Sequence, residues 1–447
     1  MTPSILILED NEERIGRFHE AVAGLRAGFE LKVWRDAQSM ASECEQFFEH
    51  AALIGLDHEL NPPWATNVSP GPVLDVAQFL GDFLPVCPVL IHSSNTEHAY
   101  SIHSELRLAG WMADRVETLG TNWIETIWLH RVRELIEGFP NRWNANRPVD
   151  HDARVERMRL SVHGLGIGDA LGEMLSCQAA NAPIKLTSDS LPRGPWIHTD
   201  DTEMAISIAA VLKSHGELNQ DALARRFARR FERDPDRGYG SMTRIQLQEM
   251  NAGATWQETA AKAFSGEGSM GNGGAMRVTP LGAYFAADLH RCASEARASA
   301  LVTHTHPEGI AGAIAVALAA ALAWQLRGIP ASERLGRFFE GVLDLTPESR
   351  VRRGILLASQ LPADAPVEDV AETLGNGSLV TAPDTVPFCL WTAAHHAEDF
   401  VKALAQVIRV GGDCDTNAAI VGGIVALSAG DSAIPTEWSE AREAVRI

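Results

Sequence analysis

Two patterns of apolar residues divide this chain of 447 residues. Over residues 1–138, short apolar runs alternate with helical patterns, beginning with the runs Ile5–Leu8, Leu31–Trp34 and Ala52–Leu56. Strands that alternate with helices in this way build a doubly wound parallel sheet. Over residues 155–447 the apolar residues keep helical spacing, and no stretch alternates convincingly as a strand would. The sequence therefore predicts a multidomain protein, with an α/β domain followed by an all-α domain.

The first domain is expected to contain five β/α units. The predicted strands are Ile5–Leu8, Leu31–Trp34, Ala52–Leu56, Val89–His92 and Arg115–Leu119. The predicted helices are Glu12–Leu25, Gln38–Glu49, Val73–Phe83, His98–Leu108 and Trp123–Glu137. Pro, Asn and charged residues without periodicity predict a linker at 139–154, which separates the two domains.

Composition indicates which binding partners and which cellular compartment to expect for this chain. The formal net charge of −20 argues against unassisted binding to nucleic acid or to an anionic membrane. Six cysteines without a C-x-x-C pair suit a reducing cytoplasm, and no secretory signal pattern is expected at Ile5–Leu8. The alanine-rich stretch Gly309–Leu322 is predicted to be a buried core helix and not a membrane span. We therefore expect a cytoplasmic protein.

Two segments far apart in the sequence are dense in oxygen donors. They are Thr199–Thr202, which reads T-D-D-T, and Gly411–Thr416, which reads G-G-D-C-D-T, and each runs directly into an apolar stretch. Carboxylates at the start of a helix lie near its positive end. If the two segments face each other, they form a site for hard divalent cations such as Mg²⁺ or Mn²⁺. The alternative is helix capping, by Asp200 with Glu203 and by Asp413 or Asp415.

A glycine-rich segment at Gly164–Gly172 precedes these clusters. It is not a dinucleotide-binding fingerprint, because its third glycine is one residue late and no strand precedes it. Most of the glycines are expected to let a helix pack tightly against its neighbours. Asp169 is the exception, since a carboxylate inside such a segment requires a partner.

Three further motifs lie in loops between helical segments. Arg237–Gly240 would place the Tyr239 ring against a ligand or form a plain loop. Gly271–Arg277 leaves backbone N–H groups open to a phosphate or a hydroxyl-rich ligand, or forms a surface turn. Thr303–Pro307 contains an H-x-H pair, for which substrate contact or helix capping is favoured over zinc binding.

Polar residues follow the predicted strands of the first domain: Glu9, Asp10, Asp57 and Ser93. In this respect the domain resembles a two-component receiver domain. The resemblance implies that the acidic pair holds Mg²⁺, that Asp57 accepts a phosphoryl group and that Ser93 supplies the switch hydroxyl. The family's lysine after the fifth strand is missing, because residues 114–121 contain none. We favour a degenerate receiver used for binding or docking over a working phosphoacceptor or a purely structural domain.

The second domain resembles the ADP-ribosylglycohydrolase family. The resemblance rests on six motifs in order, namely GDALG, W-x-x-TDDT, RGYG, GNGGAMR, THTHP and GGDCDTNAAIVGG, between residues 168 and 423. It implies an all-α fold with two Mg²⁺ ions, or Mn²⁺, in a central cleft. The implied reaction cleaves the N- or O-glycosidic bond between ADP-ribose and a protein side chain, with arginine the favoured acceptor.

The resemblance also assigns residues. The metal ligands would be Thr199, Asp200, Asp201, Asp413, Asp415 and Thr416, of which Asp201 and Asp415 would also act in catalysis. The substrate-binding residues would be Asp169, Tyr239, Asn272, Gly273, Gly274, His304 and His306. Some members carry a glutamate where this chain has Ser176, and Glu173 lies on a different helical face.

Three hypotheses follow. The first is a Mg²⁺-dependent ADP-ribosylhydrolase that acts on an ADP-ribosylated protein, with the first domain selecting the target or a partner. The second is an immunity-type protein that binds ADP-ribose or neutralises an ADP-ribosyltransferase by binding it. The third is an enzyme controlled by phosphorylation at Asp57.

Overall fold

The computed structural model describes residues 2–25, 28–58, 60–61, 69–81, 83, 85–94, 96–138, 148–176, 186, 191 and 193–445. The chain forms two compact units, Met1–Pro148 and Val149–Ile447. Most of the predicted linker, residues 139–147, lies outside the described residues. Its last four residues, 151–154, belong to the first helix of the second unit.

The first unit is built on a five-stranded sheet in the order β2-β1-β3-β4-β5. Every neighbouring pair of strands is parallel. This order is that of a flavodoxin-like doubly wound fold, so the predicted sheet architecture is confirmed. The receiver identity stays a prediction. The strands are β1 (Ser4–Leu8), β2 (Glu30–Trp34), β3 (Ala51–Asp57), β4 (Val89–Ser93) and β5 (Ala113–Glu117).

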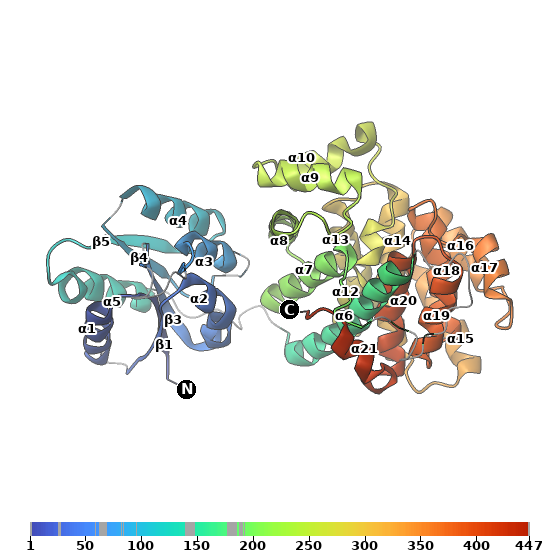
Figure 1. The fold of residues 1–447 in the computed structure, drawn as a ribbon, viewed down its shortest axis with the longest axis horizontal. Coiled ribbons are helices and arrows are strands. Elements are labelled where there is room, and N and C mark those ends of the chain that lie inside the picture. Colours follow the sequence, from blue (N-terminus) through green and yellow to red (C-terminus); the bar gives the residue numbers. More distant parts are fainter. Residues whose placement is uncertain are drawn as a thin grey trace. The chain divides into compact units, whose positions relative to one another are not determined.

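Helices cover both faces of this sheet (Figure 1). Apolar side chains of α2, α3 and α4 pack on one face, and those of α1 and α5 on the other. The two faces are separate because successive side chains of a strand point in opposite directions. The helical segments are α1 (Glu12–Ala23), α2 (Ala37–Glu43), η1 (Cys44–His50), α3 (Val73–Leu80), α4 (Thr96–Leu108), η2 (Ile124–Trp128) and α5 (Leu129–Gly138).

The second unit is helical, with only isolated β-bridges among its described residues. Its longer helices are α6 (His151–Leu175), α7 (Asp200–His215), α8 (Gln220–Arg233), α9 (Ser241–Asn251), α13 (Leu289–Leu301), α14 (Pro307–Gln325), α15 (Ala331–Leu345), α16 (Arg350–Ala358), α18 (Ala382–His395), α19 (Phe400–Arg409) and α20 (Cys414–Ala429). The shorter helical segments are α10 (Trp256–Lys262), η3 (Ala263–Gly266), α11 (Gly273–Met276), α12 (Thr279–Tyr284), α17 (Val367–Leu374), η4 (Asp431–Ala433) and α21 (Thr436–Ala441).

Helices α6 and α20 touch backbone to backbone. A Cβ atom added to Gly168 would lie 2.0 Å from the carbonyl oxygen of Ala418. One added to Gly164 would lie 2.4 Å from the carbonyl oxygen of Gly422. Gly172, one further turn along α6, meets the first turn of α20 in the same way. The expectation that these glycines serve tight packing is therefore confirmed.

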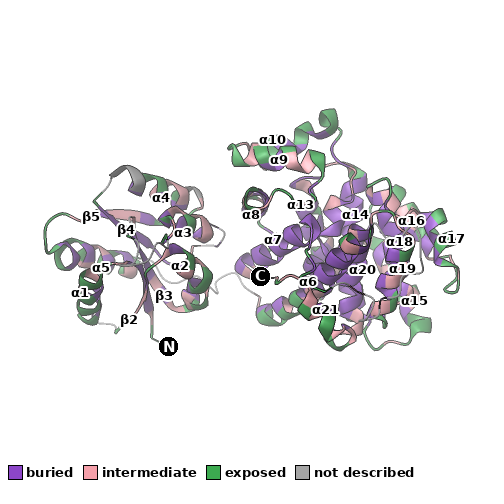
Figure 2. Ribbon diagram, in the orientation of Figure 1, coloured by how far each residue is buried: buried purple, intermediate pink, exposed green. Residues whose placement is uncertain are grey.

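The alanine-rich helix α14 lies inside the second unit. Figure 2 shows α14 and its neighbour α20 as mostly buried. Among the described helices, only α14 has the length and apolar composition needed to cross a membrane. However, 89% of its apolar stretch is buried inside the protein. Its apolar surface is used in packing against other helices of this unit.

We expect Gly168→Ala to destabilise the second unit by about 1–3 kcal/mol, because the new methyl group would force α6 and α20 apart. The control is Gly336→Ala on α15, where an added Cβ meets no atom within 4 Å. Alanine there should be neutral or should stabilise by about 0.5–1 kcal/mol. Urea unfolding of both variants measures the difference, and equal stabilities would contradict the packing argument.

Candidate active site

The start of α7 is held in place by Asp169 of α6. The backbone N–H of Thr199 donates to both carboxylate oxygens of Asp169, at 3.1 and 3.0 Å, and its hydroxyl donates at 2.8 Å. The N–H and the hydroxyl of Thr202 donate to the same carboxylate. Thr199 is itself the N-cap, and its side chain accepts from the N–H of Asp201. Asp169 therefore fixes where α7 begins, and with it the positions of Asp200 and Asp201.

The start of α20 is shaped by a glycine pair. Gly411 and Gly412 both have positive φ, at 70° and 80°, a conformation that glycine adopts without steric cost. Asp413 occupies the N-cap position, but its side chain makes no capping hydrogen bond. Its carboxylate instead accepts from the amide of Asn272 at 2.6 Å. The capping interpretation is therefore wrong for Asp413, whose carboxylate is directed to another segment.

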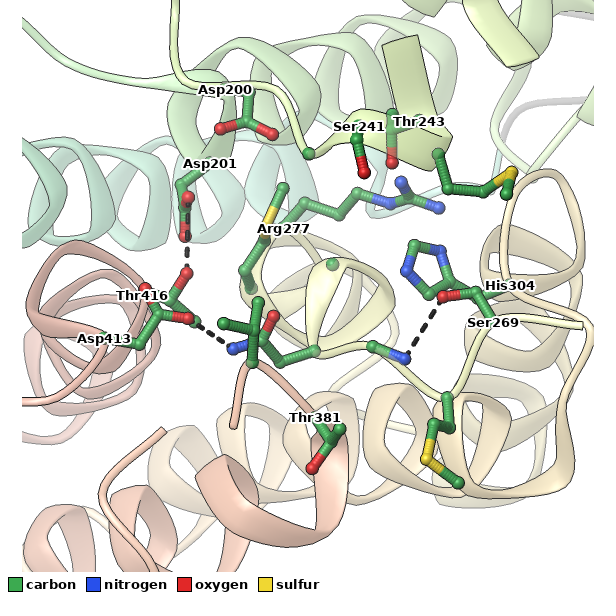
Figure 3. A pocket seen from close by; sticks show the side chains of 18 of the residues that line it. Asp200, Asp201, Ser241, Thr243, Ser269, Arg277, His304, Thr381, Asp413 and Thr416 are labelled. Atoms are coloured by element: carbon green, nitrogen blue, oxygen red, sulfur yellow. Dashed lines mark hydrogen bonds between the residues drawn. The ribbon is translucent and has the colours of Figure 1, made fainter. Parts of the chain in front are cut away.

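The two oxygen-rich segments meet. The hydroxyl of Thr416 lies 3.5 Å from Oδ2 of Asp201, although 215 residues separate them in sequence. Both segments line one pocket with a volume of about 560 Å³. In Figure 3 the carboxylates of Asp200, Asp201 and Asp413 lie at one end of this pocket, and His304 and Ser269 lie at the other. The predicted convergence of the two segments is present in the structure.

Burial and mutual repulsion change the proton affinity of these carboxylates. Burial and the neighbouring charge of Asp415 raise the pKa of Asp413 to about 7. Burial raises the pKa of Asp169 to about 6, although the hydrogen bond from Thr202 opposes this change. The pKa values of Asp200 and Asp201 are raised well above the ordinary range, first by burial and then by the other carboxylates. Without a cation the cluster favours protonation.

One oxygen of the cluster lacks a partner. Oδ1 of Asp201 is buried and accepts no hydrogen bond from any described residue. A buried acceptor without a partner costs free energy, and the cost is larger when the group is charged. A divalent cation at this end of the pocket would satisfy that oxygen and offset the repulsion among the carboxylates. The donor set, made of carboxylates with a hydroxyl beside them, is one that hard cations prefer.

A buried relay orients the ring of His304. The guanidinium of Arg277 donates to Oγ1 of Thr303 at 2.9 Å, and Oγ1 lies 2.8 Å from Nδ1 of His304. Burial lowers the pKa of His304 to about 3, so its ring is neutral. Because Thr303 accepts from Arg277, its hydroxyl proton is free to be donated to Nδ1. In the tautomer in which Nδ1 accepts this proton, His304 carries its own proton on Nε2 and can donate a hydrogen bond into the pocket.

Most of the predicted site residues line this pocket. They are Asp200, Asp201, Asn272, Gly273, His304, His306, Asp413, Asp415 and Thr416. Thr199, Asp169, Tyr239 and Gly274 are buried outside that lining. Asp169 supports the start of α7, and Tyr239 packs edge-on against Phe231 with ring centroids 5.2 Å apart. Direct ligation or substrate contact by these four residues stays a prediction.

Sequence reasoning missed several pocket residues. Arg277 ends the Gly271–Arg277 motif, in which only backbone N–H groups were expected to meet a ligand, and Ser241 and Thr243 lie within three residues after the RGYG motif. Leu379–Thr381 reach the pocket through a bridge between Thr381 and Gly271, and no local pattern marks them. His306 caps α14 by accepting from the N–H of Glu308 at 3.1 Å, as one interpretation of its motif expected.

Ser176, where the family resemblance implies glutamate in some members, lies at the C-terminal end of α6. Its hydroxyl donates to the backbone oxygen of Glu173 at 2.8 Å. The Glu173 side chain is exposed, yet burial and the charge of Asp415 raise its pKa. The charge of Asp415 thus acts on Glu173. Neither Glu173 nor Ser176 lines the pocket.

The residues predicted for a receiver-like pocket, Glu9, Asp10, Asp57 and Ser93, lie at the carboxyl ends of three neighbouring strands of the first unit. Glu9 follows β1, Asp57 ends β3 and Ser93 ends β4, and all three are buried. Arg14 reaches the same place, with a terminal guanidinium nitrogen 2.9 Å from Glu9 and 3.1 Å from Asp57. An arginine from α1 therefore lies against the acidic residues. Phosphorylation of Asp57 stays an untested prediction.

We compare the unfolding free energy of the wild type with that of Asp413→Asn, without divalent cations. The wild-type value minus the variant value should fall as the pH rises from about 5 to about 8. The pKa of Asp413 is raised in the folded protein, so the unfolded chain loses this proton at a lower pH than the folded protein does. Between the two pKa values, rising pH therefore favours the unfolded state. The difference in unfolding free energy should change by about 1 kcal/mol or more. Urea unfolding with chelator at both pH values measures it.

The control for this experiment is Asp344→Asn, at an exposed position of α15. Its difference from the wild type should show no comparable slope with pH. A pH-independent difference for Asp413→Asn would contradict the proton affinity assigned to the cluster.

Comparison with known proteins identifies the family of the second unit. The model of the ADP-ribosylglycohydrolase family matches residues 150–446. "ADP-ribosylhydrolase ARH3" of Homo sapiens is 30% identical, over 65% of this chain and 90% of its own length. The Xenopus tropicalis protein of the same name is 28% identical, over 65% of this chain and 92% of its own length.

A solved structure, "ADP-ribosylglycohydrolase-related protein complex", is 26% identical with a TM-score of 0.47, and the match covers 65% of this chain and 94% of that one. The family match itself extends over about two thirds of the sequence, the part that contains the six motifs. The chain belongs to the ADP-ribosylglycohydrolase family.

Proposed function

We propose that this protein is a Mg²⁺-dependent hydrolase that removes ADP-ribose from a modified protein side chain. Membership of the family makes it a hydrolase of glycosidic bonds. The observation that carries the finer proposal is the meeting of Asp200 and Asp201 with Asp413 and Asp415 in one pocket. The unpartnered Oδ1 of Asp201 supports a cation at this position.

The proposed metal ligands are the carboxylates of Asp200, Asp201, Asp413 and Asp415 with the hydroxyls of Thr199 and Thr416. Two Mg²⁺ ions, or Mn²⁺, are proposed because the donors are all oxygens and come from two sides. Bound there, the ions would supply positive charge that stabilises charge developing at the reacting centre. The acidic lining is consistent with this role, since the same carboxylates repel one another when no cation is present.

The residues of the chain would do the remaining work. When water adds to the anomeric carbon, the bond to the acceptor breaks and the water loses a proton. Asp201 or Asp415, which both line the pocket, would take up that proton, and a proton would pass to the departing acceptor atom, so that the carboxylate returns to its starting form. Nε2–H of His304, at the other end of the pocket, would donate to a phosphate or ribose oxygen. The neutral ring can do so without any change of protonation near neutral pH.

The rest of the lining suits the nucleoside part of the substrate. Exposed apolar side chains stand at the pocket, with Phe264 52%, Leu379 68% and Val380 58% exposed. Flat apolar groups such as a base gain from contact with such side chains. Glu267 also lines the pocket, and its carboxylate favours a cationic acceptor. We therefore propose an arginine-linked substrate before a serine-linked one.

Asp201→Ala and Asp415→Ala should each reduce release of ADP-ribose by about 10²-fold or more while the protein stays folded. Each variant removes a carboxylate that is proposed both to hold cations and to accept a proton. Release of free ADP-ribose from a modified protein, with Mg²⁺ present, measures the effect. Asp344→Ala, on the exposed surface of α15, is the matched control and should keep full activity. Full activity in either site variant would refute the assignment.

The substrate and metal proposals can be tested together. Arginine-linked and serine-linked ADP-ribosylated proteins are incubated with the enzyme, with Mg²⁺ and with chelator. We expect release with Mg²⁺, loss of release with chelator, and the faster reaction on the arginine linkage. Faster release from serine would overturn the arginine preference alone. Stable binding of either substrate without release would instead favour the hypothesis of a binding protein.

A further inference from the structure

Three buried side chains of the first unit place metal-ligating atoms close together. Glu9, Asp57 and His92 each offer a ligand atom, and these atoms all lie within 4.8 Å of one another. Asp57 and His92 are partners in the parallel pairing of β3 with β4, and Glu9 follows directly after β1. The cluster thus lies at the carboxyl ends of three adjacent strands, where doubly wound sheets bind their ligands.

The histidine of this cluster is buried without a hydrogen bond. His92 is 0% exposed, and neither of its ring nitrogens has a hydrogen-bond partner among the described residues. Its Nε2 lies 3.5 Å from Oε2 of Glu9, which is likewise buried and accepts no hydrogen bond. A buried imidazole and a buried carboxylate oxygen without hydrogen bonds destabilise the folded protein. A cation between them would satisfy both atoms.

The ring of His92 is already oriented. It stacks on Trp123, with ring centroids 5.6 Å apart and planes at 30°, and Phe18 packs against it at 5.3 Å. Phe18 and Trp123 also contact each other, with centroids 5.8 Å apart, and these two packed aromatic rings limit rotation of the imidazole. Nε2 is therefore held toward Glu9 before any ligand binds.

Asp10, the second acidic residue of the expected Mg²⁺ pair, is not one of the group of three. Its Oδ2 accepts from the backbone N–H of Asn61 at 2.6 Å. Its Oδ1 is buried without a hydrogen bond from a described residue and lies 3.7 Å from the Arg14 nitrogen that also contacts Glu9 and Asp57. His92 joins the group instead. The receiver resemblance implied oxygen ligands alone, whereas these residues offer one imidazole and two carboxylates. Imidazole ligands favour transition metals over Mg²⁺.

Arg14 supplies the positive charge now next to the cluster. One terminal nitrogen lies 2.9 Å from Oε1 of Glu9 and 3.1 Å from Oδ2 of Asp57. It leaves Oε2 of Glu9, the oxygen that faces His92, without a partner. The Arg14 side chain is 25% exposed, so a neutral replacement can be accommodated. Its charge would repel a cation bound at the neighbouring oxygens.

We propose that Glu9, Asp57 and His92 form a second metal site, in the first unit, which takes a divalent transition-metal ion such as Zn²⁺ or Mn²⁺. Three protein ligands with mixed nitrogen and oxygen donors leave coordination positions open, as in catalytic sites. Arg14 acts as the competing internal cation of this site. The site is separate from the carboxylate cluster of the second unit and does not depend on the function proposed for it.

The test uses Co²⁺ as a spectroscopic substitute, added to the full-length protein with excess Mg²⁺ present to occupy all-oxygen sites. Visible absorption reports nitrogen ligation of Co²⁺, and equilibrium dialysis gives the number of ions bound. We expect one bound Co²⁺ to be lost in His92→Gln and to be kept in His19→Gln, which changes an exposed histidine of α1. Zn²⁺ should displace the bound Co²⁺.

Arg14→Gln provides a second test, because removing the positive charge should tighten Co²⁺ binding by about tenfold or more. This variant gains binding, so misfolding cannot produce the expected result. Co²⁺ binding that is equal in wild type and folded His92→Gln would overturn the proposal. So would full displacement of Co²⁺ by Mg²⁺, or unchanged affinity in Arg14→Gln. Hydrolase activity is not the readout, so failure here leaves the function of the second unit untouched.

Discussion

The close contact between α6 and α20 is the constraint on which the second unit depends. Gly164, Gly168 and Gly172 remove the side chains that would hold the two helices apart. The backbone of α20 then lies directly on α6, and Asp415 in its first turn comes near Asp169. Asp169 in turn holds the start of α7. One packing contact therefore sets the relative positions of both oxygen-rich segments.

This arrangement concentrates negative charge in a buried place. The packing that brings the carboxylates together also removes them from water, and both effects raise their pKa values. Such a cluster is stable only with protons or cations as partners. The backbone at both helix starts is held by hydrogen bonds from outside the cluster. The N–H of Asp200 donates to the backbone oxygen of Arg237 at 2.6 Å, and the N–H of Asp413 donates to that of Asn376 at 3.2 Å. Burial of these like charges lowers stability at this end of the pocket, and the proposed cations would offset that cost.

The first unit also buries acidic residues close together, but there an arginine balances part of their charge. Buried acidic residues gather where its strands end, and Arg14 reaches over from α1 to balance part of their charge. His92 joins them from the neighbouring strand, fixed by aromatic rings. The two units thus contain two clusters of different chemistry, one with oxygen donors alone and one with an imidazole. They would select different classes of cation.

The sequence by itself determined the element types, the doubly wound sheet, the helical second unit and the family, because each is visible in local spacing and in ordered motifs. It also indicated which segments carry the site, since oxygen donors before an apolar run mark helix starts. Only the tertiary structure decided that Asp169 binds the start of α7, that the Thr303 hydroxyl contacts Nδ1 of His304, and that Arg14 and His92 lie beside the acidic residues of the first unit. The reason is physical: periodicity reports which face of an element is buried, whereas contacts between distant residues depend on how those faces pack.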